Sequence, residues 1–296
     1  MSRVWIAMAF VLANTVAQAE IRMNDDLGHE LVLTKPAQRV ISLAPHITEA
    51  LFEVGAGDLI VGAVDYSDYP EAAKQIPRVG SNKDVSYETV VSLKPDLVLA
   101  WNSNGGDKII RRLKALGIPV FVDDPKTLDD VGDILGQFGE LTGRKTQGRV
   151  AQQRYRQRLG ELRNANSNKP PLTVFYQVWH QPLMTLNGDT LISDIIEMCG
   201  GVNSFADAIP IVPRLNVESV ITADPQVIVA SGMGKARPEW LDDWLEWPIM
   251  QAVQNDQLYF VEPDILHRHS PRILLGAAQM CEHLDKARAA LLTEAK

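Results

Sequence analysis

The sequence lacks the short motifs that mark the commonest catalytic sites. It contains no GxSxG nucleophile elbow, no HExxH zinc motif and no phosphate-binding P-loop. The run Gly55-Ala56-Gly57 has no third glycine, and it lies between a predicted helix and the following strand, the reverse of what a dinucleotide-binding turn requires. These absences favour a binding protein over an enzyme, and we expect no catalytic residue.

Positive charge is also scarce. Lysine and arginine total 29 residues against 37 aspartates and glutamates, which gives a formal net charge of -8 and an isoelectric point of about 5.3. Proteins that bind nucleic acid neutralise phosphates with a basic surface. We therefore expect no nucleic-acid partner.

Long hydrophobic runs are missing as well. The apolar run from Val4 to Val16 has about 13 residues, against the roughly 20 that a membrane-spanning helix needs. It follows Arg3 and ends at Ala17-Gln18-Ala19, which is the pattern of a secretory signal peptide with an A-x-A cleavage site. We expect residues 1–19 to be a signal peptide that is cut after Ala19, and an uncleaved anchor is the alternative.

Cysteine is rare, and no CxxC motif points to redox catalysis. The chain contains 2 cysteines, Cys199 and Cys281. In an exported protein an even number of cysteines favours a disulfide, which would here close a loop of about 82 residues and stabilise the fold by roughly 4 kcal/mol. Two buried free thiols are the alternative.

The apolar residues that are present form short strands that alternate with helices. This pattern predicts parallel sheets with helical crossovers. In the first half we predict strands over residues 30–33, 39–43, 59–64, 97–100 and 120–122, and helices over 45–54, 86–93 and 107–116. In the second half we predict strands over 173–178, 227–230 and 258–261, helices over 190–198 and 218–223, and a closing helix with Ser270 as N-cap and Pro271 at its first position.

One long helix separates these halves. Residues 144–166 contain no proline, and Ala151, Tyr155, Leu159 and Leu162 form an apolar stripe at helical spacing. Such a helix would be roughly 34 Å long, enough to cross a whole domain. We interpret it as a strut that joins two lobes, and a surface helix of a single domain is the alternative.

The two halves also share a repeated segment. Residues 86–101 align without a gap with residues 216–231, so that Glu88 meets Glu218 and Pro95 meets Pro225. The predicted fold is therefore α/β, with two Rossmann-like lobes that have parallel central sheets and are joined by one long backbone helix. A ligand cleft is expected at the carboxyl ends of the strands. The expected boundaries are 20–125 for the N-terminal lobe, 126–168 for the connecting helices and 169–296 for the C-terminal lobe.

Aromatic residues lie where this cleft should open. Tyr66, Trp101 and Trp179 each follow the end of a predicted strand. Large flat rings suit a large flat or apolar ligand, because they bury much area with few rotamers. We predict that the three rings bind a ligand, although each ring taken singly could be an ordinary rim or core residue.

A polar loop could contact the other side of such a ligand. The loop over residues 264–270 contains Asp264, His267, Arg268 and His269. These groups suit the hydrogen-bonding edge of a ligand, and an ordinary solvated loop is the simpler alternative. His267 and His269 could also ligate a metal together with His180, as in a secreted metal-dependent enzyme, but their spacing matches no standard metal site.

Glu88 and Glu218 fall at the same point of the repeat, at the start of a helix. Negative charge there stabilises the helix dipole, which is a sufficient structural reason for both residues. A partner with two-fold symmetry could also bind both carboxylates through arginines.

Several segments resemble a known family. They are Arg39-Val-Ile-Ser-Leu-Ala-Pro45, Tyr66-Ser-Asp-Tyr-Pro70, Leu93-Lys-Pro-Asp-Leu-Val-Leu-Ala-Trp101, Glu197-Met-Cys-Gly-Gly201 and Ser270-Pro-Arg-Ile273. Together they resemble the cobalamin branch of the helical-backbone substrate-binding proteins of ABC importers, a group that carries cobalamin, haem or ferric siderophores. The resemblance covers essentially the whole chain after the signal peptide.

The resemblance implies a periplasmic receptor, monomeric when free, that carries cobalamin or a related corrinoid to the dimeric permease of an ABC importer. It implies little hinge closure, a disulfide between Cys199 and Cys281, and no cofactor or metal of the protein's own. Glu88 and Glu218 would be the docking carboxylates for arginines of the permease. The expected ligand-binding residues are Tyr66, Trp101, Trp179, His180, Asp264, Ile265, Leu266, His267 and Arg268.

The chain departs from this pattern at two positions. Cobalamin binders of this branch tend to have tryptophans where this chain has Asn82 and Val212. Trp179 could supply a replacement ring and His180 an additional polar group. Haem and ferric chelates therefore stay open as alternative ligands.

Overall fold

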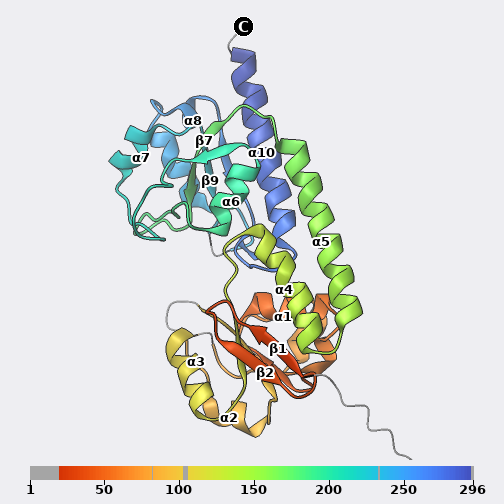
Figure 1. The fold of residues 1–296 in the computed structure, drawn as a ribbon. Coiled ribbons are helices and arrows are strands. Elements are labelled where there is room, and N and C mark those ends of the chain that lie inside the picture. Colours follow the sequence, from red (N-terminus) through yellow and green to blue (C-terminus); the bar gives the residue numbers. More distant parts are fainter. Residues whose placement is uncertain (1–19, 82, 103–105, 233, 295–296) are drawn as a thin grey trace, which may run out of the picture.

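The computed structural model describes residues 20–81, 83–102, 106–232 and 234–294. Two α/β lobes lie one above the other, and the long helix α5 (Lys145–Asn166) runs along one side of both (Figure 1). Each lobe contains a four-stranded parallel sheet flanked by helices, which confirms the predicted fold class. The predicted signal peptide and Asn82 lie outside the described residues.

The N-terminal lobe is built on a sheet with the strand order β4-β3-β5-β6. A small antiparallel pair, β1 with β2, packs beside it. The strands of this lobe are β1 (Ile21–Asn24), β2 (Glu30–Leu33), β3 (Val40–Ser42), β4 (Ile60–Ala63), β5 (Leu97–Trp101) and β6 (Val120–Asp123). Its helices are α1 (Pro45–Glu53), α2 (Tyr87–Ser92) and α3 (Gly106–Ala115). Short 3-10 turns lie over Gly57–Leu59 and Glu71–Gln75.

The C-terminal lobe is built on a sheet with the strand order β10-β9-β7-β8. Its strands are β7 (Leu172–Gln177), β8 (Gly201–Asn203), β9 (Val227–Ala230) and β10 (Leu258–Phe260). Its helices are α6 (Leu191–Met198), α7 (Val217–Ala223), α8 (Gln251–Gln254), α9 (Pro263–Leu266) and α10 (Ile273–Glu294), with a 3-10 segment over Glu239–Glu246.

The internal sequence repeat corresponds to two sheets with the same strand order, one in each lobe. Read from the other edge, the second sheet has the order β8-β7-β9-β10, which matches β4-β3-β5-β6 strand for strand. The repeated segment is the helix and strand pair α2–β5 in one lobe and α7–β9 in the other. Both helices begin with a side-chain cap, because Ser86 accepts from the backbone of Thr89 and Asn216 from that of Ser219.

The predicted long helix forms, and α4 (Leu128–Leu141) packs along it. Ala151, Tyr155 and Leu159 of the predicted stripe are buried. The two helix backbones meet at glycines, since a Cβ on Gly148 would lie only 2.7 Å from the carbonyl oxygen of Leu135. No helix among the described residues combines the length and the apolar character needed to cross a bilayer.

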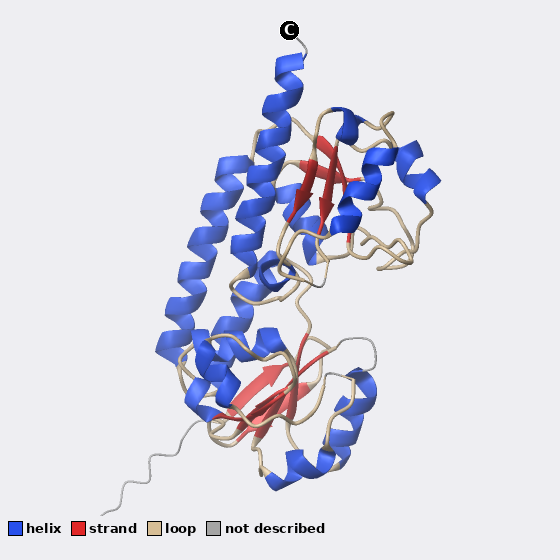
Figure 2. Cartoon of the chain, turned by 180° about the vertical axis from the view of Figure 1, so that it is seen from behind, coloured by secondary structure: helices blue, strands red, loops and turns tan. Residues whose placement is uncertain are grey.

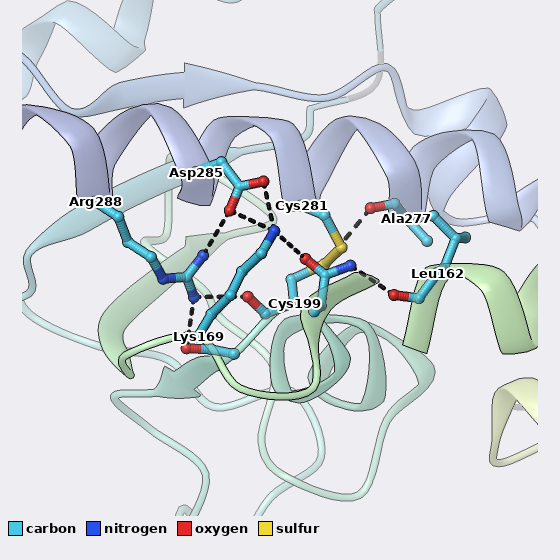
Figure 3. The surroundings of a disulfide bond; sticks show 9 residues. Leu162, Lys169, Cys199, Ala277, Cys281, Asp285 and Arg288 are labelled. Carbon is cyan, nitrogen blue, oxygen red and sulfur yellow. Dashed lines mark hydrogen bonds and ion pairs between the residues drawn. A yellow bond between two sulfur atoms is a disulfide. The ribbon is translucent and has the colours of Figure 1, made fainter. Parts of the chain in front are cut away.

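The predicted disulfide between Cys199 and Cys281 is present and ties the end of α6 to α10 (Figure 3). Nearby, Lys169, which follows α5, lies 2.6 Å from Asp285 of α10. Arg288 of α10 donates to the carbonyl oxygen of Cys199 at 2.7 Å. The alternative of two free thiols is therefore wrong, and the ion pair of Lys169 with Asp285 holds the segment after α5 to α10.

Two local predictions need correction. The closing helix α10 begins at Ile273, so Ser270 is not its N-cap and Pro271 does not occupy its first position. The hydroxyl of Ser270 instead donates to Glu49 of the other lobe at 2.5 Å. Residues 264–266, predicted as part of the loop over 264–270, lie in the short helix α9 (Pro263–Leu266).

Candidate ligand-binding cleft

A cleft of about 790 Å³ opens between the two lobes. The two sheets flank the space between the lobes (Figure 2). The lining comes from residues that follow strands, Trp101 and Asn102 at the end of β5 and Asp124 after β6, and from Thr190 at the start of α6. This is the position that parallel α/β sheets use for ligands, because their loops converge beyond the carboxyl ends of the strands.

The wall from the N-terminal lobe is polar, but its charges are largely paired. Asn102 donates to Asp124 Oδ2 at 3.2 Å, and Lys126 Nζ lies 2.9 Å from the same oxygen. Lys83 is the other cation on this lining. This wall therefore offers hydrogen bonds more than net charge.

The wall from the C-terminal lobe is mainly aliphatic. Ile211 is 55% exposed and Val212 is 39% exposed, so this wall presents apolar surface to solvent. Apolar surface of this kind is favourable only when a ligand or partner covers it. Its lining residues are Val178, Leu186, Leu191, Ile192, Pro210, Ile211 and Val212, with the polar pair Asp189 and Thr190 at the start of α6.

Histidines lie at the junction of the lobes. His267 and His269 line the cleft, and the rings of His46 and His269 both lie 5.4 Å from the ring of Trp101. Burial lowers the pKa of His46 and of His267 to about 4, and that of His269 to about 3. These imidazoles are therefore neutral at neutral pH.

Two of these imidazoles have a protein partner. His46 Nε2 lies 3.1 Å from Asp123 Oδ2, and His267 Nε2 lies 2.5 Å from the hydroxyl of Tyr176. Burial also raises the pKa of Asp123 well above its ordinary value. The junction of the lobes is thus a buried region in which the charged forms of these groups are disfavoured.

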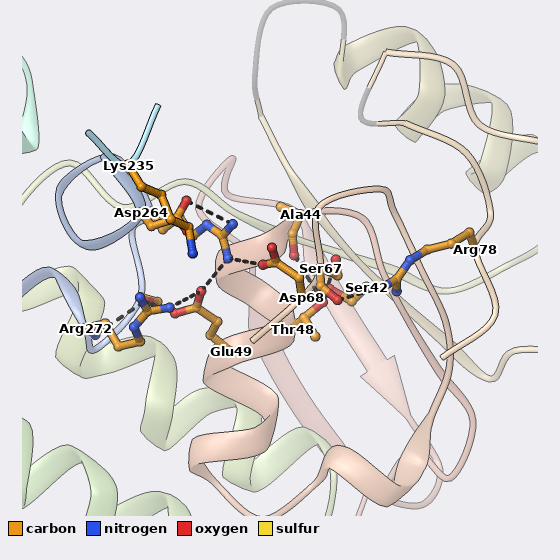
Figure 4. A network of polar contacts seen from close by, with 12 residues as sticks. Ser42, Ala44, Thr48, Glu49, Ser67, Asp68, Arg78, Lys235, Asp264 and Arg272 are labelled. Atoms are coloured by element: carbon orange, nitrogen blue, oxygen red, sulfur yellow. Dashed lines mark hydrogen bonds and ion pairs between the residues drawn. The ribbon is translucent and has the colours of Figure 1, made fainter. Parts of the chain in front are cut away.

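A buried group of charges, which we call the interlobe cluster, connects the lobes beside the cleft (Figure 4). Glu49 of α1 is 4% exposed, and it accepts from Arg268 at 2.9 Å, from Ser270 at 2.5 Å and from Arg272 at 3.2 Å. All three partners belong to the segment between α9 and α10. The cluster therefore fixes this segment of the C-terminal lobe to the first helix of the other lobe.

Arg268 makes further contacts in the interlobe cluster. It lies 2.8 Å from Asp68 and 3.1 Å from Asp264. Burial disfavours the charged form of Asp68, but the hydrogen bond and charge of Arg268 outweigh this effect, so the pKa of Asp68 lies below its ordinary value. The guanidinium of Arg268 is therefore already neutralised by protein carboxylates.

The predicted ligand-binding residues take different positions. Trp101 and His267 line the cleft. Asp264 and Arg268 belong to the interlobe cluster, whereas Leu266 is fully buried in the hydrophobic core and Ile265 packs against that core. Their roles in ligand binding stay predictions.

Tyr66 has an unusual backbone. Its side chain is 79% exposed, and its φ of 63° places it in the left-handed region, which is uncommon for a residue other than glycine. The neighbouring Ser67 is buried, and its hydroxyl accepts from Thr48 at 3.1 Å. The chain is thus anchored beside Tyr66, while the phenol ring points into solvent.

Trp179 and His180 lie outside this lining. The indole of Trp179 donates to the carbonyl of Gln181 at 2.9 Å, and the side chain is 39% exposed. His180 lines a separate pocket of about 500 Å³, where it stacks on Trp240. The three histidines considered as metal ligands are therefore not gathered, and within the described ranges no group of three His, Cys, Asp or Glu side chains is arranged to hold a metal ion.

Several residues of the cleft lining are not among the predicted site residues. Asn102, Asp124 and Lys126 follow β5 and β6, so the rule that selected Trp101 at a strand end would have found them. Ile211 gave no such signal, because an aliphatic residue after a proline is typical of any surface loop, and Val212 is indicated only by the resemblance, as a position where a tryptophan is expected. Glu49 lies in a predicted helix, and no sequence pattern indicates its partners more than 200 residues away.

Glu88 and Glu218, the predicted docking residues, occupy matched positions. Each lies in the first turn of its helix, α2 or α7, and both are exposed. In Figure 1, α7 lies on the side of the upper lobe away from α5, and α2 lies at the lower end of the other lobe. The structure thus presents two carboxylates from equivalent points of the two lobes.

Two similar α/β lobes, a helical strut and a wide cleft between them define a substrate-binding protein of the two-lobed type. Residues 40–265 match the family model described as periplasmic binding protein. The chain belongs to this family.

Individual relatives cover most of the chain. It is 36% identical over 253 residues to the vitamin B12-binding protein of Vibrio cholerae serotype O1, covering 85% of this chain and 91% of the relative. It is 37% identical over 256 residues to the vitamin B12-binding protein of Yersinia pestis, covering 86% and 89%.

Solved structures show the same fold. The periplasmic vitamin B12 binding protein BtuF of Vibrio cholerae superposes with a TM-score of 0.79 at 35% identity, covering 86% of this chain and 98% of that one. The periplasmic haem-binding protein RhuT of Roseiflexus sp. RS-1 superposes with a TM-score of 0.74 at 23% identity, which shows the shared fold alone.

Proposed function

We propose that the protein captures cobalamin or a related corrinoid in the interlobe cleft and delivers it unchanged to an ABC importer. The observation that carries this proposal is the cleft itself, which has one hydrogen-bonding wall and one apolar wall around Trp101. A corrin combines a broad apolar ring with amide side chains at its edge, and such a ligand matches both walls. The names of the relatives, two of them vitamin B12-binding proteins, support the same ligand.

The charge balance of the cleft favours a corrinoid over haem or a ferric siderophore. Haem carries two carboxylates, and many ferric siderophores are anions, so their receptors need free cations. Here Lys126 is paired with Asp124, and Arg268 contacts Glu49, Asp68 and Asp264. Lys83 alone would have to compensate for several negative charges.

Tyr66 is not among the residues that line the cleft, and its backbone conformation and exposure are what support a role in ligand binding. A residue other than glycine in the left-handed region is a strained conformation, and such conformations cluster at functional sites. Here the strain accompanies a phenol ring held out in solvent, although aromatic rings ordinarily gain from burial. We assign this ring to contact with the corrin.

Delivery would use Glu88 and Glu218. Both are exposed and equivalent by the internal repeat, so a permease dimer with two-fold symmetry could bind each through the same arginine. Trp179 and His180 lie outside the cleft lining, and we propose a ligand-binding role for both, which fluorescence titration of Trp179→Ala and His180→Ala would test.

The remaining assignments follow from the family. The family is described as periplasmic, and we propose that a signal peptide over residues 1–19 directs export and is cut after Ala19. We also propose a monomer when free, no catalysis, no resident cofactor, and lobe boundaries at 20–125, 126–168 and 169–296. One four-stranded parallel sheet precedes α4 and α5 in the chain and the other follows them, which supports these boundaries.

Titration of tryptophan fluorescence tests the ligand. Trp101 lines the cleft, so cyanocobalamin and cobinamide should quench emission saturably, and hemin or ferric siderophores should bind at least roughly tenfold more weakly. N-acetyltryptophanamide controls for absorption by the coloured ligands. Saturable quenching by hemin alone would show that the corrinoid assignment is wrong, and recovery of a chemically altered ligand would indicate an enzyme.

A further inference from the structure

His269 lines the cleft, and its neutral ring has a nitrogen that no other described residue contacts through a hydrogen bond. Its Nδ1 is sealed from solvent and has no hydrogen-bond partner among the described residues. The ring nevertheless lines the cleft, so Nε2 is the nitrogen that a bound ligand can reach. In the Nδ1–H tautomer, Nε2 carries a lone pair that can bind a ligand atom.

The structure holds this imidazole in place from several directions. Arg268 and Ser270, on either side of His269, both bind the buried carboxylate of Glu49. The backbone N–H of Ser270 donates to the carbonyl of Arg268 at 2.7 Å, which closes a tight turn around His269. The rings of Trp101 and His46 lie 5.4 and 5.6 Å away. Fixation of this kind is typical of a group that must meet a ligand atom in one orientation.

His267 serves as an internal comparison, because its corresponding nitrogen is occupied. Its Nε2 lies 2.5 Å from the hydroxyl of Tyr176. Burial raises the pKa of Tyr176, so the hydroxyl keeps its proton and can donate it to that nitrogen. His267 Nε2 is thus occupied by a protein hydrogen bond, whereas no hydrogen bond among the described residues occupies either ring nitrogen of His269.

We infer that His269 Nε2 is a nitrogen ligand for the metal of the bound macrocycle. The lone pair of Nε2 forms a bond to the cobalt, and an exchangeable axial water leaves as a neutral molecule, with no change in oxidation state. The inference rests on the proposed corrinoid binding. The same lone pair could bind the iron of haem, and the experiment separates the two metals.

Visible absorption of diaquocobinamide tests the inference, because exchange of an axial water for imidazole shifts the main bands of the corrin. The wild-type protein should shift these bands on binding, and dicyanocobinamide, whose axial positions are blocked, should bind without a shift. His269→Gln should abolish the shift and weaken binding of diaquocobinamide by roughly tenfold or more. His29→Gln, at an exposed histidine that does not line the cleft, is the control and should keep the shift.

Each other outcome has a defined meaning. Saturable fluorescence quenching by diaquocobinamide without a band shift in the wild type, or an equal shift in His269→Gln, would overturn the inference and leave corrinoid binding intact. Failure of every corrinoid to quench would overturn the proposed function. In that case a His269-dependent shift of the hemin Soret band would assign the nitrogen to iron, and an unchanged Soret band would exclude axial ligation by His269 altogether.

Discussion

The two lobes are alike on the outside and different where they face each other. Their sheets share one strand order, and their equivalent helices α2 and α7 carry side-chain caps and matched exposed glutamates. At the cleft, however, the N-terminal lobe contributes polar groups and the C-terminal lobe mainly aliphatic ones. A duplicated structure can thus keep a symmetric outer surface for one partner while its inner faces diverge for an asymmetric ligand.

The sharpest difference lies in the first helix of each lobe. Glu49 of α1 is buried against Arg268, Ser270 and Arg272 of the other lobe. In the corresponding helix α6, Asp194 is only partly buried and accepts from the backbone of Leu128, at the start of α4. One carboxylate is therefore the centre of a buried charge cluster, and the other caps a helix.

Removal of Glu49 should give the largest effect. Glu49→Ala leaves two partly buried arginines without this carboxylate, and breaking a buried ion pair by removing one partner costs about 3–5 kcal/mol. Asp194→Ala removes a helix-terminal hydrogen bond and should cost about 1 kcal/mol. Urea denaturation measures both values, and equal losses would show that the two carboxylates have the same role.

Reversal of the matched glutamates tests the symmetric surface. Glu88→Arg combined with Glu218→Arg should lower cobalamin uptake by about a hundredfold or more, because loss of an interfacial charge partner costs about 2–5 kcal/mol. Ligand affinity should stay unchanged, since both residues are exposed and neither lines the cleft. Uptake is measured in cells that depend on this receptor, and affinity by fluorescence titration.

The control for this variant carries the same change of charge elsewhere. Glu161 of α5 and Glu282 of α10 are exposed and lie outside α2 and α7. Glu161→Arg with Glu282→Arg should leave uptake nearly normal. An equal loss in the control would attribute the effect to net charge, and a large loss of affinity in the test variant would place the glutamates in the binding site.

Much of this architecture could be predicted from local sequence. The spacing of Ala151, Tyr155 and Leu159 predicts the strut, which forms within one residue of its expected start. The gapless repeat predicts two lobes of one topology, and the structure confirms it. These features depend on periodic burial and on short-range caps, which single segments of sequence contain.

The details of the site depend on contacts between distant segments. Glu49 meets residues that follow it by more than 200 positions, and nothing in its helix distinguishes it from an exposed glutamate. His269 was visible as one of several polar residues in a loop, but its sealed Nδ1 depends on packing against Trp101 and His46. His180 looked equivalent in sequence and lies in another pocket.

The buried imidazoles of the cleft should make stability depend on pH. The folded pKa of His269 is about 3, below the ordinary value of 6.5, so between these values the unfolded chain binds a proton that the folded protein does not. The contribution of His269 to the free energy of unfolding is therefore complete above pH 6.5 and decreases as the pH falls, by up to about 1.4 kcal/mol per pH unit for this one group.

Urea denaturation at pH 7, 6 and 5 should show that the free energy of unfolding decreases less steeply with falling pH for His269→Gln than for the wild type. The exposed His29, changed to Gln, should leave the slope as it is in the wild type. If the free energy of unfolding changed equally with pH in His269→Gln and in the wild type, the fold would not keep this imidazole neutral. The contrast between a cleft with neutral histidines and a charged outer surface would then lose its main support.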